Sequence, residues 1–540
     1  MLKLNNEGIL LKEEWEKENY ILPKFDREMV TKETMKNPVW IHFGAGNIFR
    51  SFPAALQQNL LNVGKSNKGI IVAEGYDYEI IEKINKIHDD LSLMVILKAN
   101  GTIEKTVIGS IVESLTVDSD NTKDFERLKE IFKNPSLQMV SFTITEKGYS
   151  LVDKDGEYTQ IVLEDFNNGP HRPKSYIGKL TALCYERYLG GKSPVALVSM
   201  DNCSHNGTKL YNAVSTFAEK WTKNKNVEDG FLDYINNKNS VSFPWSMIDK
   251  ITPRPDDGVK DMLIKSGFSD VEPIVTNKNT YVASFTNAEE AEYLVIEDIF
   301  PNGRPKLEDA GVKFTDRDTV DRVEKMKVCT CLNPLHTALA VFGCLLSYTK
   351  IYKEMEDTEL KELVEKVGYI EGLPVVVDPK IINPKEFIDE VLNKRIPNPF
   401  MPDTPQRIAT DTSQKMSIRF GETIKAYINS PELKVTDLKF IPLVIAGWCR
   451  YLLGVDDNGE KFEISPDPML PLLKEHLRGI KLGEKAHYHE KLKPILSNEN
   501  IFGVNLYEAG LGELIETYFE EMIDAKGAVR ATLKKNLYCS

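Results

Sequence analysis

A short apolar segment followed by a glycine-containing turn and a helical pattern constrains the fold of this chain most strongly. Residues 39–43 read Val-Trp-Ile-His-Phe, which is typical of a buried strand, and residues 51–61 have the apolar spacing of a helix. Gly44 and Gly46 stand in the turn between them. A strand, a Gly-x-Gly turn and a helix in this order are typical of the start of a dinucleotide-binding βαβ unit.

Each glycine of the turn has an expected role. Gly44 allows the tight turn, and Gly46 lets a pyrophosphate approach the amides at the helix N-terminus. Phe49 stands where the third glycine of the fingerprint would be, so a turn that serves only packing is the alternative. On the dinucleotide hypothesis the whole turn contacts the cofactor: Gly44, Ala45, Gly46, Asn47, Ile48, Phe49 and Arg50.

A second apolar segment, residues 69–73, is followed by Glu74 and Asp77. A carboxylate at the end of the second strand binds the 2′-hydroxyl of the adenosine ribose and repels the 2′-phosphate of NADP. We therefore expect NAD as the cofactor, although Glu74 follows Gly46 later than the usual offset of about 20 residues. Either carboxylate has an alternative role as the cap of a helix that begins near Tyr78.

Strands and helices alternate in the first half of the chain, and helical patterns dominate the second half. In the first half we predict further strands over residues 91–98, 106–112, 138–145 and 194–199, with helices over 122–132 and 176–188. In the second half we predict helices over residues 333–348, 358–367, 384–392, 412–428, 438–453, 470–477 and 511–526. The expected fold is α/β: a Rossmann-type, mostly parallel sheet domain with insertions (residues 1–318), a mainly helical domain (residues 319–540), and a cleft between them.

Composition excludes several classes of function. The chain has 540 residues, too many for one core, and its 41% apolar and 28% charged residues are ordinary for a globular protein. A net charge of −13 argues against nucleic acid or an anionic membrane as a partner. The N-terminus is too charged for a signal peptide, and seven irregularly spaced cysteines indicate reduced thiols. We expect a cytoplasmic enzyme, monomeric or a small homo-oligomer, that binds a small molecule.

Residues 324–336 form the segment that indicates most about the function of the chain. They read Glu-Lys-Met-Lys-Val-Cys-Thr-Cys-Leu-Asn-Pro-Leu-His and precede an apolar run. Lys327 offers a proton donor, and Asn333 and His336 offer neutral donors for an oxygen on which negative charge develops, as carbonyl reduction requires. The two cysteines and His336 are an alternative zinc site, but Cys-x-Cys spacing is atypical and a fourth ligand is not evident.

Four further polar clusters follow strands or lie beside prolines: residues 145–149, 201–207, 247–255 and 407–415. Taken singly, each is explained as well by helix caps, surface ion pairs or core packing. Three more segments belong with them: the glycine turn, the segment Asn-x-x-His-Thr-Ala-Leu-Ala and residues 446–452. This set resembles the signature motifs of the mannitol dehydrogenase family, and the motifs follow one another along the chain in the same order as in that family. This family of long-chain polyol dehydrogenases includes the hexuronate reductases. The resemblance runs from residue 39 to residue 468.

The resemblance implies metal-independent hydride transfer between NAD(H) and a secondary alcohol or ketone. By that pattern Lys327 is the acid/base, and Asn202 and Asn333 hold the developing alkoxide. His336 orients the substrate, and Glu324 matches a carboxylate at the mouth of the proton path. The other positions expected at the substrate or cofactor are Asp249, Arg254, Arg407, Lys415, Thr145 and Glu146.

Within the family the chain is most similar to the hexuronate reductases, which implies that D-fructuronate is reduced to D-mannonate. The reduction of D-tagaturonate and the oxidation of mannitol are alternatives, and a sensor that binds NAD and a sugar acid without turnover is a distant one. A hexuronate carries a carboxylate, which arginine binds bidentately. Arg254 and Arg407 are the candidates for this contact.

The segment departs from the family pattern at one point. The family places four residues between the lysine and the asparagine, and a glycine after the asparagine; here five residues separate Lys327 from Asn333, and Pro334 replaces the glycine. On an α-helix one extra residue adds about 100° of rotation. We predict either a π-bulge that absorbs the extra residue or a break with Asn333 as N-cap. In a regular α-helix, Lys325 would become the candidate acid/base.

Overall fold

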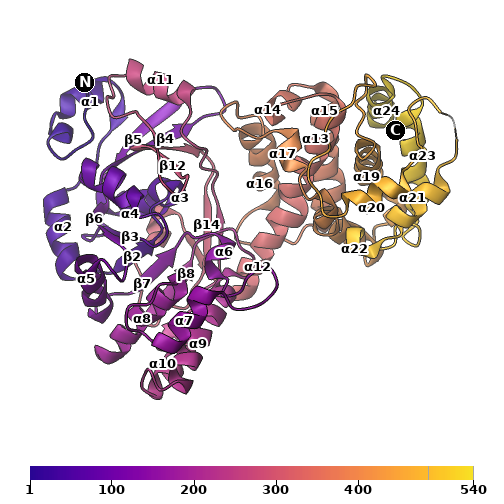
Figure 1. The fold of residues 1–540 in the computed structure, drawn as a ribbon. Helices are drawn as coiled ribbons and strands as arrows, with labels where there is room; N and C mark the ends of the chain where they lie inside the picture. Colours follow the sequence, from indigo (N-terminus) through magenta and orange to yellow (C-terminus); the bar gives the residue numbers. More distant parts are fainter. Residues whose placement is uncertain (485, 539–540) are drawn as a thin grey trace. The chain divides into compact units, whose positions relative to one another are not determined.

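The computed structural model describes residues 1–484 and 486–538, and these form two compact units (Figure 1). The first unit comprises Met1–Lys98 and Thr102–Asp321, and the second comprises Ala99–Gly101 and Arg322–Ser540. Strands and helices are mixed in the first unit, whereas the second is helical. This division agrees in kind with a sheet-rich half followed by a helical half.

A six-stranded parallel sheet forms the centre of the first unit. Its order, β6-β3-β2-β7-β8-β9, is the 3-2-1-4-5-6 order of a Rossmann fold when the strands are counted along the chain, so the predicted fold is confirmed. The strands are β2 (Trp40–Phe43), β3 (Ile70–Glu74), β6 (Ile111–Thr116), β7 (Met139–Phe142), β8 (Val195–Ser199) and β9 (Val241–Ser242). The order reverses between β2 and β7, where such sheets bind ligands.

Helices cover this sheet because its strands are apolar on both faces. Successive side chains of a strand point to opposite faces, and along β2 Ile41 and Phe43 enter one core while Trp40 enters another. The first core also contains side chains of α5 (Thr122–Lys133), α8 (Tyr176–Leu189), α9 (Asn206–Lys223) and α10 (Gly230–Asn236). The second contains side chains of α3 (Asn47–Ser51) and α4 (Pro53–Asn62).

Smaller sheets are inserted into this framework, and here the strand prediction was partly wrong. Residues 106–112 are not one strand, because β5 (Ile103–Ile108) ends before β6 begins. The Gly109 amide donates to the Gln58 side chain (2.7 Å), and the Ser110 hydroxyl donates to the Ala54 carbonyl (2.6 Å), so this segment bonds to α4. Several strands were not predicted at all, among them β10 (Ser246–Asp249), β13 (Phe285–Glu289), β14 (Tyr293–Glu297) and β15 (Lys313–Thr315).

The second unit is built around two buried helices, α13 (Asn333–Leu345) and α19 (Phe440–Tyr451). They approach closely at Gly447, where an added Cβ would lie 2.7 Å from the Phe342 ring. The helical run Arg317–Leu345 is long and apolar enough to cross a membrane, but 78% of its apolar window is buried, as expected of a core helix. Other helices include α12 (Arg317–Lys325), α15 (Thr358–Glu365), α16 (Pro384–Glu390), α17 (Pro405–Ile408), α18 (Glu422–Ile428), α23 (Gly512–Ile523) and α24 (Ala528–Tyr538).

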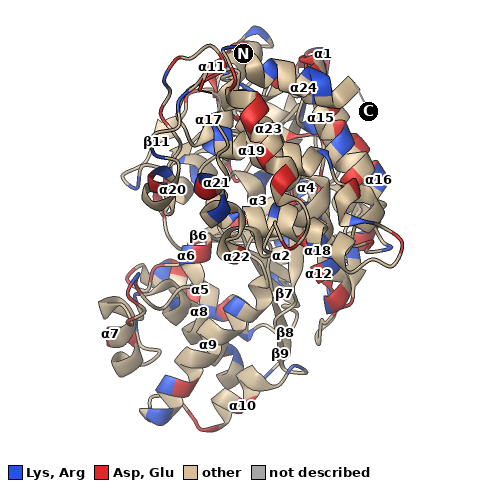
Figure 2. Ribbon diagram, turned by 90° about the vertical axis from the view of Figure 1, so that its right-hand side faces the viewer, with Lys and Arg blue, Asp and Glu red and all other residues tan. Residues whose placement is uncertain are grey.

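Charged residues of both signs are interspersed on the exposed helices. Figure 2 shows acidic and basic positions side by side on α12 and α16. On α16, Lys385 and Asp389 form an ion pair at 2.9 Å. Neither helix therefore presents a face of one sign, unlike the basic stripe that is typical of a nucleic-acid-binding helix.

Candidate active site

A cavity of about 910 Å³ lies in the first unit beside the carboxyl ends of β2, β3 and β7. It lies at the point where the strand order reverses, and its size suits a small-molecule ligand. Five of the predicted cofactor residues line it: Gly44, Gly46, Glu74, Asp77 and Thr145. Among the described residues, the other predicted cofactor residues do not line it: Ala45, Asn47, Ile48, Phe49, Arg50, Glu146 and Asn202.

The glycine turn has the shape that a dinucleotide requires. Gly44 has a φ of +115°, and an added Cβ would lie 2.8 Å from the Thr143 carbonyl oxygen, so only glycine fits. An added Cβ on Gly46 would have no neighbour within 4 Å, so the space in front of this residue is open. Gly46 is the N-cap of α3, whose first amides suit a pyrophosphate. The turn therefore fits the phosphates of a dinucleotide.

Glu74 binds the glycine turn itself. One carboxylate oxygen accepts the Ala45 amide (2.8 Å), and the other accepts the amides of Tyr76 (2.8 Å) and Asp77 (3.1 Å). Burial raises the pKa of this carboxyl. A carboxylate oxygen accepts more than one hydrogen bond, so these contacts are compatible with a ribose hydroxyl as a further donor. Glu74 thus connects the end of β3 to the turn after β2.

Asp77 and Lys179 lie farther along the same cavity. Asp77 is buried and accepts the Thr276 hydroxyl (2.6 Å), so its carboxylate is held by a loop of the inserted region. Lys179, on α8, is also buried and donates to the Tyr78 hydroxyl (2.8 Å). Burial lowers the pKa of Lys179 to about 8. Lys179 was not predicted, because nothing in a helical pattern marks a lysine that lines a cavity.

Phe49 and Arg50 were predicted to contact the cofactor, but their side chains belong to the framework. Phe49 is fully buried and stacks on the His42 ring at 4.4 Å. Arg50 is 1% exposed and donates to the Ala283 carbonyl (2.7 Å) and the Asn47 side chain (2.9 Å). These two side chains attach the turn to the surrounding structure and are buried away from a ligand.

The structure brings together two of the polar clusters. The Tyr149 hydroxyl donates to the Asp201 carboxylate, and Lys209 forms an ion pair with Glu146. Asn206 is buried, and its amide group donates to the carbonyls of residues that end β8 and begin β10, including Ser246 (3.1 Å). Asn202 is exposed next to Asp201.

The two substrate residues predicted in the first unit differ in their surroundings. Asp249 is buried and is the last residue of β10. Arg254 is exposed in the loop that follows, and its carbonyl accepts the Asn287 side chain (3.1 Å). In this unit the guanidinium of Arg254 is therefore accessible to solvent.

In the second unit, the predicted irregularity after Lys327 is confirmed. Met326–Cys331 is a π-helix, and the Leu332 amide donates to the Lys327 carbonyl five residues earlier (3.1 Å). Leu332 leaves helical geometry with a φ of −131°, and α13 then begins with Asn333 and Pro334. The N-cap is therefore Leu332 rather than Asn333. Pro334 lies in the first turn, where its missing amide costs no hydrogen bond.

His336 lies on α13 among charged groups that the sequence did not associate with it. Its Nε2 atom is 3.5 Å from the Asp403 carboxylate, which also pairs with Arg407. Burial, together with the guanidinium groups of Arg419, Arg407 and Arg395, lowers the pKa of His336 to about 3. The imidazole is therefore neutral near pH 7 and can both donate and accept a hydrogen bond.

Lys415 and Arg419 lie in the same part of the second unit. Lys415 donates to the Thr410 carbonyl, and Arg419 donates to the Thr337 hydroxyl on α13. Burial and the charge of Arg419 lower the pKa of Lys415, and burial lowers the pKa of Arg419 to about 10. Of the charged residues near His336, only Lys415 and Arg407 were predicted as substrate residues. Arg419 and Asp403 were missed because their contacts with α13 join residues far apart in sequence.

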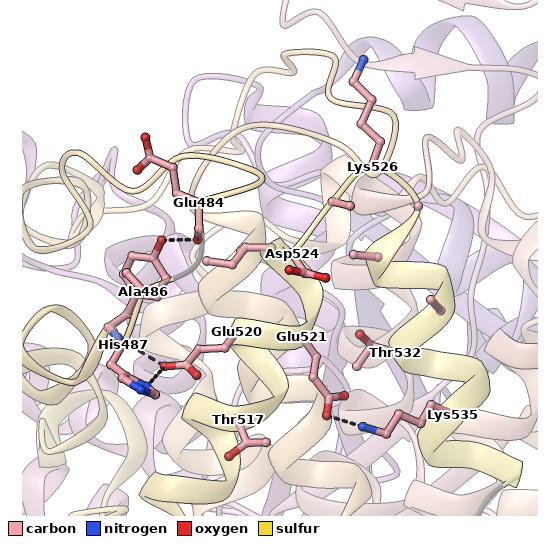
Figure 3. A pocket seen from close by; sticks show the side chains of 16 residues that line it. Glu484, Ala486, His487, Thr517, Glu520, Glu521, Asp524, Lys526, Thr532 and Lys535 are labelled. Carbon is pink, nitrogen blue, oxygen red and sulfur yellow. Dashed lines mark hydrogen bonds and ion pairs between the residues drawn. The ribbon is translucent and has the colours of Figure 1, made fainter.

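Two other possible sites were tested against the structure. Among the described residues, no group of three His, Cys, Asp or Glu side chains could hold a metal ion, the zinc alternative included. A pocket of about 730 Å³ lies between α23, α24 and the segment before α21 (His489–Leu496) (Figure 3). Two of its carboxylates are paired, Glu520 with His487 (3.2 Å) and Glu521 with Lys535 (2.6 Å). None of the predicted site residues lines this pocket.

The fold and the site define a Rossmann-type dinucleotide-binding protein with a second, helical domain that carries a cluster of polar and charged side chains. Family models for the mannitol dehydrogenase Rossmann domain and the mannitol dehydrogenase C-terminal domain match residues 39–309 and 319–523. The chain therefore belongs to the mannitol dehydrogenase family, and the predicted membership is confirmed.

Individual relatives are similar over almost the whole chain. The chain is 55% identical to the D-mannonate oxidoreductase of Thermotoga maritima over 99% of both proteins. It is 28% identical to a mannitol 2-dehydrogenase of Cereibacter sphaeroides, over 85% of this chain and 88% of that one. A D-sorbitol dehydrogenase in substrate-free form has a TM-score of 0.77 at 25% identity and covers 95% of this chain and 97% of its own. The Pseudomonas fluorescens mannitol 2-dehydrogenase, in a ternary complex with NAD and D-mannitol, has a TM-score of 0.67 at 26% identity. That match covers 98% of this chain and 99% of the other.

Proposed function

We propose that this member of the family is an NAD-dependent oxidoreductase that interconverts D-fructuronate and D-mannonate. The observation that carries the proposal is the 55% identity, over 99% of both chains, to a D-mannonate oxidoreductase. The mannitol and sorbitol dehydrogenases are half as similar, at 25–28% identity. A glycine turn that fits a pyrophosphate, with Glu74 at the end of β3, supports NAD as the cofactor.

In the proposed reaction Lys327 gives a proton to the carbonyl oxygen during reduction and removes it from the hydroxyl during oxidation. NADH, when bound, supplies the hydride. Asn202 and Asn333 donate to the oxygen as its negative charge develops, a role in which one lost donor typically costs about 2.7–4 kcal/mol. Glu324 and Lys327 stand on either side of the junction between α12 and the π-helix, which supports their assignment to one proton path.

His336 is proposed to orient the substrate by hydrogen bonding. Its neutral state supports this role, because an imidazole whose pKa is about 3 keeps one donor and one acceptor at the pH of the cytoplasm, the compartment we propose. The nearby carboxylate of Asp403 is a partner that fixes which ring nitrogen carries the proton.

The positive charge around His336 supports an anionic substrate. Arg407, Lys415 and Arg419 contribute cations to this part of the second unit. Arg407 pairs with the Asp403 carboxylate, whereas Lys415 donates to a carbonyl and Arg419 to a hydroxyl. Arg407 is 63% exposed on its side chain and so remains accessible. Together with Asp249 in the first unit, Arg407 and Lys415 are the proposed substrate contacts, and Arg254 is the second candidate for the uronate carboxylate.

A comparison of substrates tests the proposal. Oxidation of NADH and NADPH is followed with D-fructuronate, D-tagaturonate and fructose side by side. We expect the highest kcat/KM for D-fructuronate with NADH. A higher value for D-tagaturonate would assign the enzyme to the other hexuronate, and a higher value for fructose would contradict a uronate reductase.

The carboxylate contact has its own test. Replacing Arg407 or Arg254 by Leu should raise KM for D-fructuronate by at least tenfold, since a hydrogen bond to a charged group contributes about 1.5–3 kcal/mol. KM for fructose, which lacks the carboxylate, should change much less. Equal effects on the two substrates would remove that arginine from consideration.

A further inference from the structure

Three buried polar side chains and one half-buried threonine form a continuous chain of hydrogen bonds across β2 and β7, and the mechanism proposed above uses none of them. The Trp40 indole N–H donates to the Ser141 Oγ atom (2.7 Å). Ser141 Oγ lies 2.6 Å from His42 Nδ1, and His42 Nε2 lies 2.8 Å from Thr143 Oγ1. Trp40, His42 and Ser141 are fully buried. The chain ends at Thr143, which lines the cofactor cavity.

The strand pairing explains why these side chains meet. His42 and Ser141 are direct neighbours in the parallel pair β2 and β7. Trp40 and His42 lie two residues apart, as do Ser141 and Thr143, and such residues share one face of a sheet. The stack of the His42 ring on Phe49 of α3, at 4.4 Å and 13°, fixes the plane of the imidazole. Neither ring nitrogen is therefore free to turn toward another partner.

The direction of the hydrogen bonds follows from the first donor. An indole N–H can only donate, so Ser141 Oγ accepts it. In the described part of the chain, the only other partner of this hydroxyl is His42 Nδ1, so the Ser141 hydrogen is satisfied only if Nδ1 accepts it. A buried hydroxyl left without an acceptor would cost about 1–3 kcal/mol. The proton of the neutral imidazole then lies on Nε2, which donates to Thr143.

His42 is neutral because burial lowers its pKa to about 3. With Nε2 as the donor, Thr143 Oγ1 is the acceptor, and its own hydrogen has to point elsewhere. Thr143 lies directly after β7, opposite the glycine turn: a Cβ added to Gly44 would be 3.0 Å from Thr143 Oγ1. The open direction is therefore the cavity, at the place where the glycine turn fits a pyrophosphate.

We propose that the Thr143 hydroxyl donates a hydrogen bond to a pyrophosphate oxygen of bound NAD(H), and that His42 and Ser141 are positioning residues that set the direction of this donor. The proposal rests on the use of NAD(H) proposed above, but not on the identity of the sugar. It gives a reason for a histidine inside a strand where an apolar residue would be expected.

Binding of NADH, measured by fluorescence titration without any sugar, tests the proposal. Thr143→Val removes the hydroxyl at constant shape and should weaken NADH binding by about tenfold or more, as expected for one hydrogen bond to a charged group. ADP, which has the phosphates but no nicotinamide ribose, should be weakened to the same extent. Thr143→Ser should restore binding of both.

A matched control and a double-mutant cycle separate positioning from general damage to the fold. Thr181→Val removes another buried hydroxyl, which donates to the Ile177 carbonyl (2.8 Å) within α8, and should leave NADH binding unchanged. Ser141→Ala should weaken NADH binding on its own but add nothing in the Thr143→Val background, because no Thr143 donor is then left to position.

The outcomes that overturn the proposal are distinct. If Thr143→Val binds NADH as the wild type does, the hydroxyl is not a ligand. If NADH is weakened but ADP is not, the contact is not with the pyrophosphate. If Ser141→Ala and Thr143→Val are additive, His42 does not transmit the effect. Failure of the wild-type protein to bind NADH would instead overturn the function proposed above.

Discussion

The π-helix that contains Lys327 predicts opposite results for two changes at the same position. Deletion of Val328 leaves four residues between the lysine and the asparagine, which is the spacing of the family pattern, and allows a regular α-helix. Insertion of one alanine after Val328 increases the interval to six residues, which the existing bulge does not absorb. If the bulge of Met326–Cys331 serves to absorb one residue, the deletion is tolerated and the insertion is not.

The size of the effect follows from helix geometry. One residue on an α-helix corresponds to about 100° of rotation, and with Cα atoms about 2.3 Å from the axis, this displaces a Cα by roughly 3.5 Å. The tip of a lysine side chain moves farther. A misplacement of about 1 Å at a reacting group can cost about 10²-fold in rate. The insertion variant should therefore lose at least about 10²-fold in kcat, and the deletion variant should stay within about tenfold of the wild type.

Steady-state kinetics with D-fructuronate and NADH measures the effect, and circular dichroism with NADH titration checks that both variants are folded. Because NADH is expected to bind the first unit, both variants should bind it normally. A folded deletion variant with a 10²-fold lower kcat would refute the reasoning, since the bulge itself would then be required. A fully active insertion variant would show that the register of Lys327 does not matter.

Three further predictions concern charged groups and metal ions. Glu354 is fully buried, its carboxyl oxygens have no hydrogen-bond partner among the described residues, and burial raises its pKa well above the ordinary value. Its proton is therefore held to higher pH in the folded state than in the unfolded state. The contribution of this group to the free energy of unfolding is fully present below about pH 4 and falls by up to about 1.4 kcal/mol per pH unit as the pH rises toward the folded pKa. Chemical denaturation measures the free energy of unfolding from pH 5 to 8. Its decline over this range should be smaller for Glu354→Gln than for the wild type, and unchanged for the exposed control Glu356→Gln. Glu74→Gln replaces one oxygen of the carboxylate, which accepts the Ala45 amide of the glycine turn, by an NH2 donor. This change should raise the Kd for NADH by about tenfold, whereas Glu82→Gln on the surface should not. Dialysis against EDTA should leave kcat unchanged, as expected of metal-independent hydride transfer, and loss of activity that zinc restores would contradict that chemistry.

The parts of the fold that could be predicted have patterns that are local in sequence. The strand at Trp40–Phe43, the glycine turn and the strand ending at Glu74 are adjacent along the chain, and the structure confirms the fold that they predict. The π-helix was also predictable, because an extra residue and a proline are visible in the segment itself. The strands between Ser246 and Thr315 were missed, since they are short and pair with strands distant in sequence.

The candidate site was less predictable for the same reason. The sequence indicated Lys415 and His336 but not the charges around His336, because Asp403 and Arg419 reach α13 through contacts between residues far apart in sequence. It assigned Arg50 to the cofactor, although a buried arginine that donates to the Ala283 carbonyl stabilises the framework. A pattern of residue types predicts which chemistry is present, whereas the hydrogen-bond partners of each group depend on the tertiary structure.

The most direct test of the proposed reaction is the Lys327→Ala variant, with Lys325→Ala as its control. General acid–base catalysis contributes about 10²–10⁴-fold, so Lys327→Ala should lower kcat for D-fructuronate reduction by at least 10²-fold. Its Kd for NADH should stay within about twofold of the wild type, and Lys325→Ala should remain active. A catalytically competent Lys327→Ala variant, or loss of activity in Lys325→Ala instead, would contradict the assignment of Lys327. If the wild-type protein binds NADH but turns over none of the sugars, the chain is a sensor and not an enzyme.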